Sequence, residues 1–114
     1  MEKEELTHKN LLISIGGRHS VEPKNVVVFE GDANYSHVYL KNGLVLTVAT
    51  TLKNLEKRFG KHNFLRVHKK YLVNLKEVKS CKKNEVMLKN KKSIIVSRRK
   101  KSDLQNRLLV KKSV

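Results

Sequence analysis

Residues 64–75 read FLRVHKKYLVNL, and this stretch decides the fold. Apolar side chains fill both of its halves, while its middle carries the polar run HKK at residues 68–70. A strand cannot bury three such groups in a row, and a helix gains nothing from placing them side by side. We therefore expect two short strands joined by a raised connection, with buried anchors at both ends and two lysines presented to solvent.

A second basic run, SRRKK at residues 97–101, follows another apolar segment. We expect a helix to begin here, with Ser97 as its cap and with Leu104 and Leu108 as apolar contacts one turn apart. Four cations in the first turn of a helix oppose the helix dipole, which indicates that an anionic partner offsets them. We expect the two basic runs to lie on one face that binds nucleic acid.

The charge of the chain is unevenly distributed. The 114 residues carry a net charge of +16, and residues 65–114 alone carry +14, because they hold 17 of the 26 Lys and Arg but three of the ten Asp and Glu. Such an excess predicts a polyanionic partner, since surfaces that serve only solubility mix both signs of charge. Nucleic acid, an anionic membrane surface and an acidic protein all fit this charge.

The length of the chain predicts one domain with a single core. We expect a flexible lead-in or linker remnant over residues 1–10, the folded domain over 11–110 and a tail over 111–114. No apolar run approaches the roughly 20 residues that cross a bilayer. The N-terminus is acidic and no apolar region follows it, so we do not expect a secretory signal. The single cysteine excludes an internal disulfide and is typical of a reducing compartment, so we expect a cytoplasmic protein.

Turn signals divide the rest of the chain into short strands. Gly16-Gly17, Pro23 and Asn42-Gly43 interrupt the apolar runs, and Asn-Gly suits a tight hairpin turn. The β-branched run at residues 26–29 is typical of a strand buried on both faces. Besides the two strands within 64–75, the expected strands cover residues 11–15, 26–29, 35–40, 44–48, 77–82, 85–89 and 93–96.

The alternation in residues 35–40 predicts which side chains face the core. With Val38 and Leu40 pointing inward, the side chains that point outward are Tyr35, His37 and Tyr39.

One interior stretch has the period of a helix, because Leu52, Leu55 and Phe59 form a single stripe. Thr50 or Thr51 can cap its N-terminus, and Gly60 supplies its stop. The strands and helices together predict a mainly β fold, made of small antiparallel sheets with two short helices.

Several of these segments resemble a known family. RVHKKYLVN at residues 66–74, SRR at 97–99, EGD at 30–32 and NG at 42–43 resemble the LytTR-type DNA-binding domain, the C-terminal effector domain of bacterial LytR/AlgR-class response regulators. The resemblance covers residues 13–108. It implies DNA binding in bacterial two-component transcriptional regulation, on paired repeats and with a possible homodimer on DNA. We expect the receiver or sensor domain to lie outside this chain.

The resemblance also implies how DNA is read, namely by loop and strand-end side chains that enter the major groove. The base-contacting residues it implies are His37, Lys69 and Arg99. An arginine can donate two hydrogen bonds to guanine O6 and N7, and a lysine can reach the same acceptors with less geometric selectivity. Contacts to the DNA backbone are expected from Lys41, Arg66, His68, Lys70, Arg98, Lys100 and Lys101. Arg66 and His68 match the motif, and a structural role for both stays open.

Other functions fit the sequence less well. We find no constellation of catalytic residues and expect neither an enzyme nor a cofactor or metal site, although His62 and His68 lie near each other in sequence. An RNA-binding or ribosome-associated basic module is the alternative, but few aromatic residues are left for stacking on bases. A basic helix that binds a membrane surface is a third possibility for residues 97–109, and its apolar face would be narrow.

Overall fold

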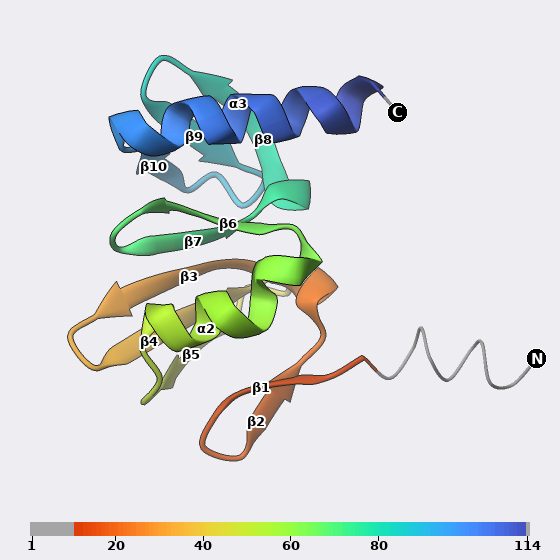
Figure 1. Ribbon diagram of the computed structural model, residues 1–114. Helices are drawn as coiled ribbons and strands as arrows, with labels where there is room; N and C mark the ends of the chain where they lie inside the picture. Colours follow the sequence, from red (N-terminus) through yellow and green to blue (C-terminus); the bar gives the residue numbers. More distant parts are fainter. Residues whose placement is uncertain (1–10, 114) are drawn as a thin grey trace, which may run out of the picture.

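The computed structural model describes residues 11–113, and the side chains among them up to Leu108. Its centre is a five-stranded antiparallel sheet in the order β5-β4-β3-β7-β6 (Figure 1). The strands of this sheet are β3 (Val26–Asp32), β4 (Tyr35–Leu40), β5 (Val45–Val48), β6 (Phe64–His68) and β7 (Tyr71–Asn74).

Two smaller sheets and two helices surround the central sheet. The two-stranded sheet pairs β1 (Ile13–Gly16) with β2 (His19–Val21), and the three-stranded sheet has the order β10-β9-β8. Its strands are β8 (Val78–Lys82), β9 (Glu85–Leu88) and β10 (Ser93–Ile95). The helices are α2 (Leu52–Phe59) and α3 (Arg98–Ser113), with 3₁₀ turns η1 (Pro23–Asn25), η2 (Gly60–His62) and η3 (Leu75–Glu77). The prediction of small antiparallel sheets with two helices is confirmed.

The central sheet is buried on both faces, so the expectation of a single core is wrong. On one face Phe29 packs against Phe59 and Phe64, with ring centroids 4.8 and 5.6 Å away. On the other face Val28 belongs to a second cluster with residues of β8–β10 and α3. Adjacent residues of a strand point to opposite faces, so Val28 and Phe29 serve different clusters. The all-buried run at residues 26–29 is as predicted.

The two-sided sheet also changes the environment of Tyr39. We expected its side chain to point outward, but it is half-buried and packs against the second cluster. Tyr35 is exposed and Val38 is buried, as expected. Because both faces of the sheet are covered, a side chain that points away from one cluster packs against the other. The alternation of apolar residues alone does not show that the second face is covered.

Helix α2 begins as predicted but ends differently. Its cap is Thr51, whose side chain accepts a hydrogen bond from the Asn54 amide at 3.4 Å. Gly60 does not end the helix by adopting a left-handed conformation, because its φ is −57° and the backbone continues into η2. Asn63, with a φ of 67°, makes the reversal instead. Asparagine is one of the few residues that adopts this conformation readily.

The remaining boundaries lie within a few residues of those expected. Leu11 and Leu12 precede β1 and are exposed, and β8 starts after η3 at Val78. The tail expected from residue 111 begins inside α3, which continues to Ser113. The lead-in expected at residues 1–10 lies outside the described residues.

Candidate nucleic-acid interface

One end of the molecule, at the left in Figure 1, carries three hairpin turns and the start of α3. The turns connect β3 to β4, β6 to β7 and β8 to β9. Backbone hydrogen bonds join them. The Gly31 amide donates to the Lys70 carbonyl at 2.8 Å, which links the end of β3 to the β6–β7 turn. The Ser97 amide donates to the Val67 carbonyl at 3.0 Å, which places the start of α3 against β6. We call this end of the molecule the turn end.

Both predicted basic runs lie at the turn end. Lys69 and Lys70 form the exposed β6–β7 turn, and Arg98 and Arg99 are exposed in the first turn of α3. A surface hollow of about 430 Å³ lies between the two runs, and its lining residues are Glu56, Arg66, His68, Lys69, Ser97 and Lys100. No acidic residue lies in the first turn of α3. The structure therefore brings the two runs onto one surface, as the sequence predicts.

A second hollow of about 470 Å³ continues this surface toward β3 and α2. Lys69 and Lys70 line it together with Asp32 at the end of β3 and Lys53 on α2. Asp32 in turn contacts His37, because its Oδ2 lies 3.1 Å from the His37 Nε2. The third predicted base-contacting residue is thus connected to the same surface through Asp32.

The side chain of His37 is held at both ring nitrogens. Its Nδ1 lies 2.8 Å from the Thr47 Oγ1 on β5, while its Nε2 faces the Asp32 carboxylate. The His37 side chain is half-buried, whereas that of Asp32 is 66% exposed. A hydrogen bond from Nε2 to a base therefore requires the Asp32 carboxylate to move aside.

A polar cluster beside His37 fixes the strands that carry it. Glu30 on β3 pairs across the sheet with both His37 and Tyr71, and its carboxylate accepts from the Tyr39 and Tyr71 hydroxyls at 2.8 and 3.1 Å. The Lys92 Nζ lies 4.6 Å from the centre of the Tyr39 ring. This arrangement ties β3, β4 and β7 together at the turn end.

The cluster shifts the pKa values of its members. Partial burial opposes ionisation of Glu30, but hydrogen bonds from Tyr39 and Tyr71 and the charges of Lys92 and His37 outweigh it, so the pKa of Glu30 is lowered. Burial and the hydrogen bond to Glu30 raise the pKa of Tyr39 to about 12. The same two causes raise the pKa of Tyr71.

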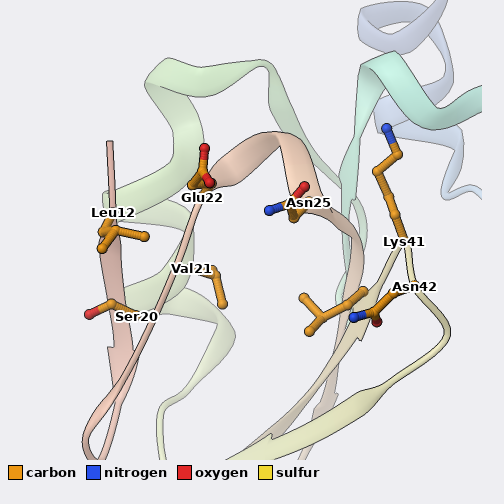
Figure 2. Close-up of a pocket in the computed structure, with 8 residues that line it drawn as sticks. Leu12, Ser20, Val21, Glu22, Asn25, Lys41 and Asn42 are labelled. Atoms are coloured by element: carbon orange, nitrogen blue, oxygen red, sulfur yellow. The ribbon is translucent and has the colours of Figure 1, made fainter. Parts of the chain in front are cut away.

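Lys41 is the one predicted DNA-contacting residue that the structure separates from the others. It follows the last residue of β4, at the end of that strand farther from the β3–β4 turn, and its Nζ lies 3.6 Å from the Glu77 carboxylate. Figure 2 shows its side chain extending toward η3, beside a hollow of about 520 Å³ that Asn25 and Asn42 also line. Lys41 is therefore not part of the turn end.

Two lysines at the turn end escaped the sequence reasoning. Lys82 ends β8 and Lys83 begins the β8–β9 turn, and both are exposed. The Val96 amide donates to the Asn84 carbonyl of that turn at 2.7 Å. The signal lies in the order of the strands. Because β10 runs antiparallel to β9, the residues after β10 return to the point where β9 begins. The start of α3 must therefore lie beside the β8–β9 turn.

The part of the chain that the structure describes gathers no group of three or more His, Cys, Asp or Glu side chains able to hold a metal ion. Over the same residues, neither helix has the length and the apolar character that crossing a membrane requires.

Comparison with known proteins finds a matching family and a similar solved structure. The family model for the LytTr DNA-binding domain matches residues 16–109 of this chain. A solved LytTr DNA-binding domain of a response regulator from Bacillus cereus has a similar fold, with a TM-score of 0.68 at 22% sequence identity. That match covers 85% of this chain and 93% of the other. No curated protein matches the chain.

Proposed function

The chain belongs to the LytTr DNA-binding domain family, whose members bind DNA in transcription regulation, and we propose that it binds double-stranded DNA at specific sequences. The observation that supports this most strongly is the turn end itself. Two hollows lie against the β6–β7 turn, one of them also against the start of α3, and a backbone hydrogen bond from Val96 to Asn84 holds the β8–β9 turn beside that start. A cationic surface held by backbone hydrogen bonds can meet the regularly spaced phosphates of a duplex without reorganising.

In this proposal, loop and strand-end side chains read bases in the major groove. Arg99 reads a guanine through a bidentate contact, Lys69 reads a neighbouring base, and His37 reads a third once Asp32 moves aside. Phosphate contacts hold the protein in register. We assign these contacts to Lys70, Lys82, Lys83, Arg98, Lys100 and Lys101.

Three residues expected to contact the DNA backbone are left out of this assignment. Lys41 lies away from the turn end and is paired with Glu77. Arg66 and His68 use their side chains to bind the backbone of the β6–β7 turn.

We extend the proposal to paired DNA repeats, with two copies of the domain meeting on DNA as part of a response regulator. Two adjacent sites would raise the apparent affinity without any new contact to a base, because the second binding event becomes local. Binding curves on one repeat and on two repeats measure this. Equal affinity per repeat on both duplexes would show that the copies act independently.

The test begins with selection of bound sequences from a random duplex pool, followed by titration of the selected duplex and a random one at several salt concentrations. The logarithm of the binding constant should fall steeply with the logarithm of salt concentration. Arg99→Ala should cost about 1–3 kcal/mol on the selected duplex and much less on the random one. Arg18→Ala, at an exposed arginine in the β1–β2 turn, is the control and should leave both affinities unchanged.

Two results would contradict the proposal. A binding constant that does not change with salt would show that the protein makes no phosphate contacts. Equal losses of affinity for Arg99→Ala on both duplexes would show that Arg99 contacts a phosphate and not a base. RNA binding is tested in parallel by competition with a structured RNA. The aromatic side chains disfavour it, since Phe29, Phe59 and Phe64 are buried and Tyr35 alone among the described aromatics is exposed, at 52%.

A further inference from the structure

The backbone of the β6–β7 turn is held by hydrogen bonds at three successive polar groups. The Arg66 Nη2 donates to the Lys69 carbonyl at 2.5 Å. The Lys70 amide donates to the His68 Nδ1 at 3.2 Å, and the Lys70 carbonyl accepts from the Gly31 amide at 2.8 Å. A two-residue turn of exposed lysines would otherwise be free to move, because its side chains make no buried contacts.

Arg66 also connects this turn to helix α2. Its Nη1 lies 3.5 Å from the Glu56 Oε1, and its side chain is only 26% exposed. The buried Nε has no partner among the described residues. The guanidinium thus lies between an α2 carboxylate and the carbonyl of Lys69, with donors directed at both.

This placement makes Arg66 a poor ligand for phosphate. Glu56 offsets part of its charge, Nη1 and Nη2 each already have an acceptor within the protein, and little of the side chain reaches solvent. Lysine could not take its place, because the two acceptors lie in different directions and an ammonium on a single flexible stem does not span them as a planar fork does.

We propose that Arg66 is a positioning residue for Lys69: Arg66 fixes the direction in which the Lys69 side chain leaves the turn. The inference rests on the proposed function, since it concerns the lysine assigned to read a base. The start of α3 is bound to β6 through Ser97 and Val67, two residues before the turn. Fixing the Lys69 carbonyl therefore also fixes the distance from Lys69 to Arg99. Arg66 consequently acts on sequence discrimination and not on general attraction to DNA.

The test compares Arg66→Lys with Arg58→Lys, which is a matched control. Arg58 also donates to a backbone carbonyl, that of Ser14 at 3.1 Å, but it lies on α2 and binds β1. Arg66→Lys should lower the ratio of affinities for selected and random duplexes by about tenfold, the value of one base contact of ordinary strength. The salt slope should stay unchanged, and Arg58→Lys should change neither quantity.

Two additions make the result specific to Lys69. In a Lys69→Ala background, Arg66→Lys should cause no further loss of discrimination, because the two residues act through the same contact. In the free protein, hydrogen exchange at the Lys70 amide should be faster in Arg66→Lys and unchanged in Arg58→Lys. Thermal unfolding reports whether each variant folds. If Arg66→Lys does not fold, Glu56→Gln weakens the same connection and should give smaller changes of the same sign.

Four outcomes would overturn the inference. One is a salt slope reduced by about 0.9 with equal losses on both duplexes, which is the signature of a lost phosphate contact. Another is unchanged exchange at the Lys70 amide. The third is full discrimination in Arg66→Lys while Lys69→Ala loses it, which leaves the proposed function standing. If Lys69→Ala itself keeps full discrimination, base reading by Lys69 fails and the role of Arg66 fails with it.

Discussion

The Gly31 amide donates to the Lys70 carbonyl at 2.8 Å, and this bond joins the end of β3 to the turn that presents Lys69. Gly31 also lies against the first residue of α2, because a Cβ placed on it would be 3.1 Å from the Leu52 Cγ and Cδ1. A Cβ at this position would therefore require Leu52 to shift by a few tenths of an ångström. Gly31 connects core packing to the position of the basic turn.

We predict that Gly31→Val destabilises the protein by about 1–3 kcal/mol, the usual cost of inserting carbon atoms into a filled site. Equilibrium unfolding in urea measures this. Gly60→Ala is the matched control, because Gly60 has a φ of −57° and no atom within 4 Å of its added Cβ. It should be neutral or stabilising by about 0.4–1 kcal/mol. A Gly31→Val variant as stable as the parent would show that Leu52 can move aside freely.

The stretch at residues 64–75 was predictable because its information is local. Apolar residues flank a polar turn, and the turn cannot be buried, so β6, β7 and the exposed lysines follow from the sequence alone. The helix cap at Thr51 is local in the same sense. The hairpin around Asn42-Gly43 also forms, although residues 41–44 connect its strands and only Gly43 of the pair has a positive φ. The family resemblance rests on the same kind of pattern and is confirmed by the match over residues 16–109.

What the sequence could not reveal depends on bonds between distant residues. The burial of Tyr39 requires a second layer on the sheet, which residues 78–108 supply. Lys41 and Lys69 look equivalent as exposed lysines in turns, and only the direction of β4 separates them. Arg66 donates to a carbonyl only three residues away, but recognising that role requires knowing that Glu56 lies behind it.

The separation of Lys41 from the turn end gives a second prediction. Lys83→Gln should reduce the slope of log K against log salt concentration by about 0.9, because it removes one phosphate contact. Lys41→Gln removes the same charge from the chain but should leave the slope unchanged, since Lys41 is paired with Glu77 elsewhere. Titrations of a random duplex at four or more salt concentrations measure both slopes. Equal reductions would mean that total charge, and not the turn end, controls binding.

Asp32 gives a third prediction, because it places a largely exposed carboxylate at the turn end, beside Lys69 and Lys70. Asp32→Asn should strengthen binding to any duplex, by removing repulsion from phosphates and by weakening the hold on the His37 Nε2. We expect a gain of a few fold at low salt that shrinks as salt is added, since exposed charges are screened. Glu22→Gln, in the segment between β2 and η1, is the control and should change little. Weaker binding of Asp32→Asn would mean that the carboxylate orients His37 for its contact.

The cluster around Glu30 predicts how stability depends on pH. A raised pKa in the folded state means that protonated Tyr39 stabilises the fold fully below its ordinary pKa of about 10, and that this contribution is lost as the pH rises through about 12. Glu30 has the opposite sign, because its pKa is lowered. Its contribution is present above the ordinary value of 4.5 and is lost as the pH falls through the lower, folded value.

Tyr39→Phe tests the alkaline half of this dependence. It removes the titrating hydroxyl and one hydrogen bond to Glu30, so the variant should be less stable at pH 8 and should lose less stability than the parent between pH 10 and 12. Urea unfolding at a series of pH values measures the difference. Tyr35→Phe, at the exposed start of β4, should keep the pH dependence of the parent. If Tyr39→Phe also kept it, ionisation of Tyr39 would not be what weakens the folded state at high pH, and Tyr71, whose pKa is also raised, would have to account for it.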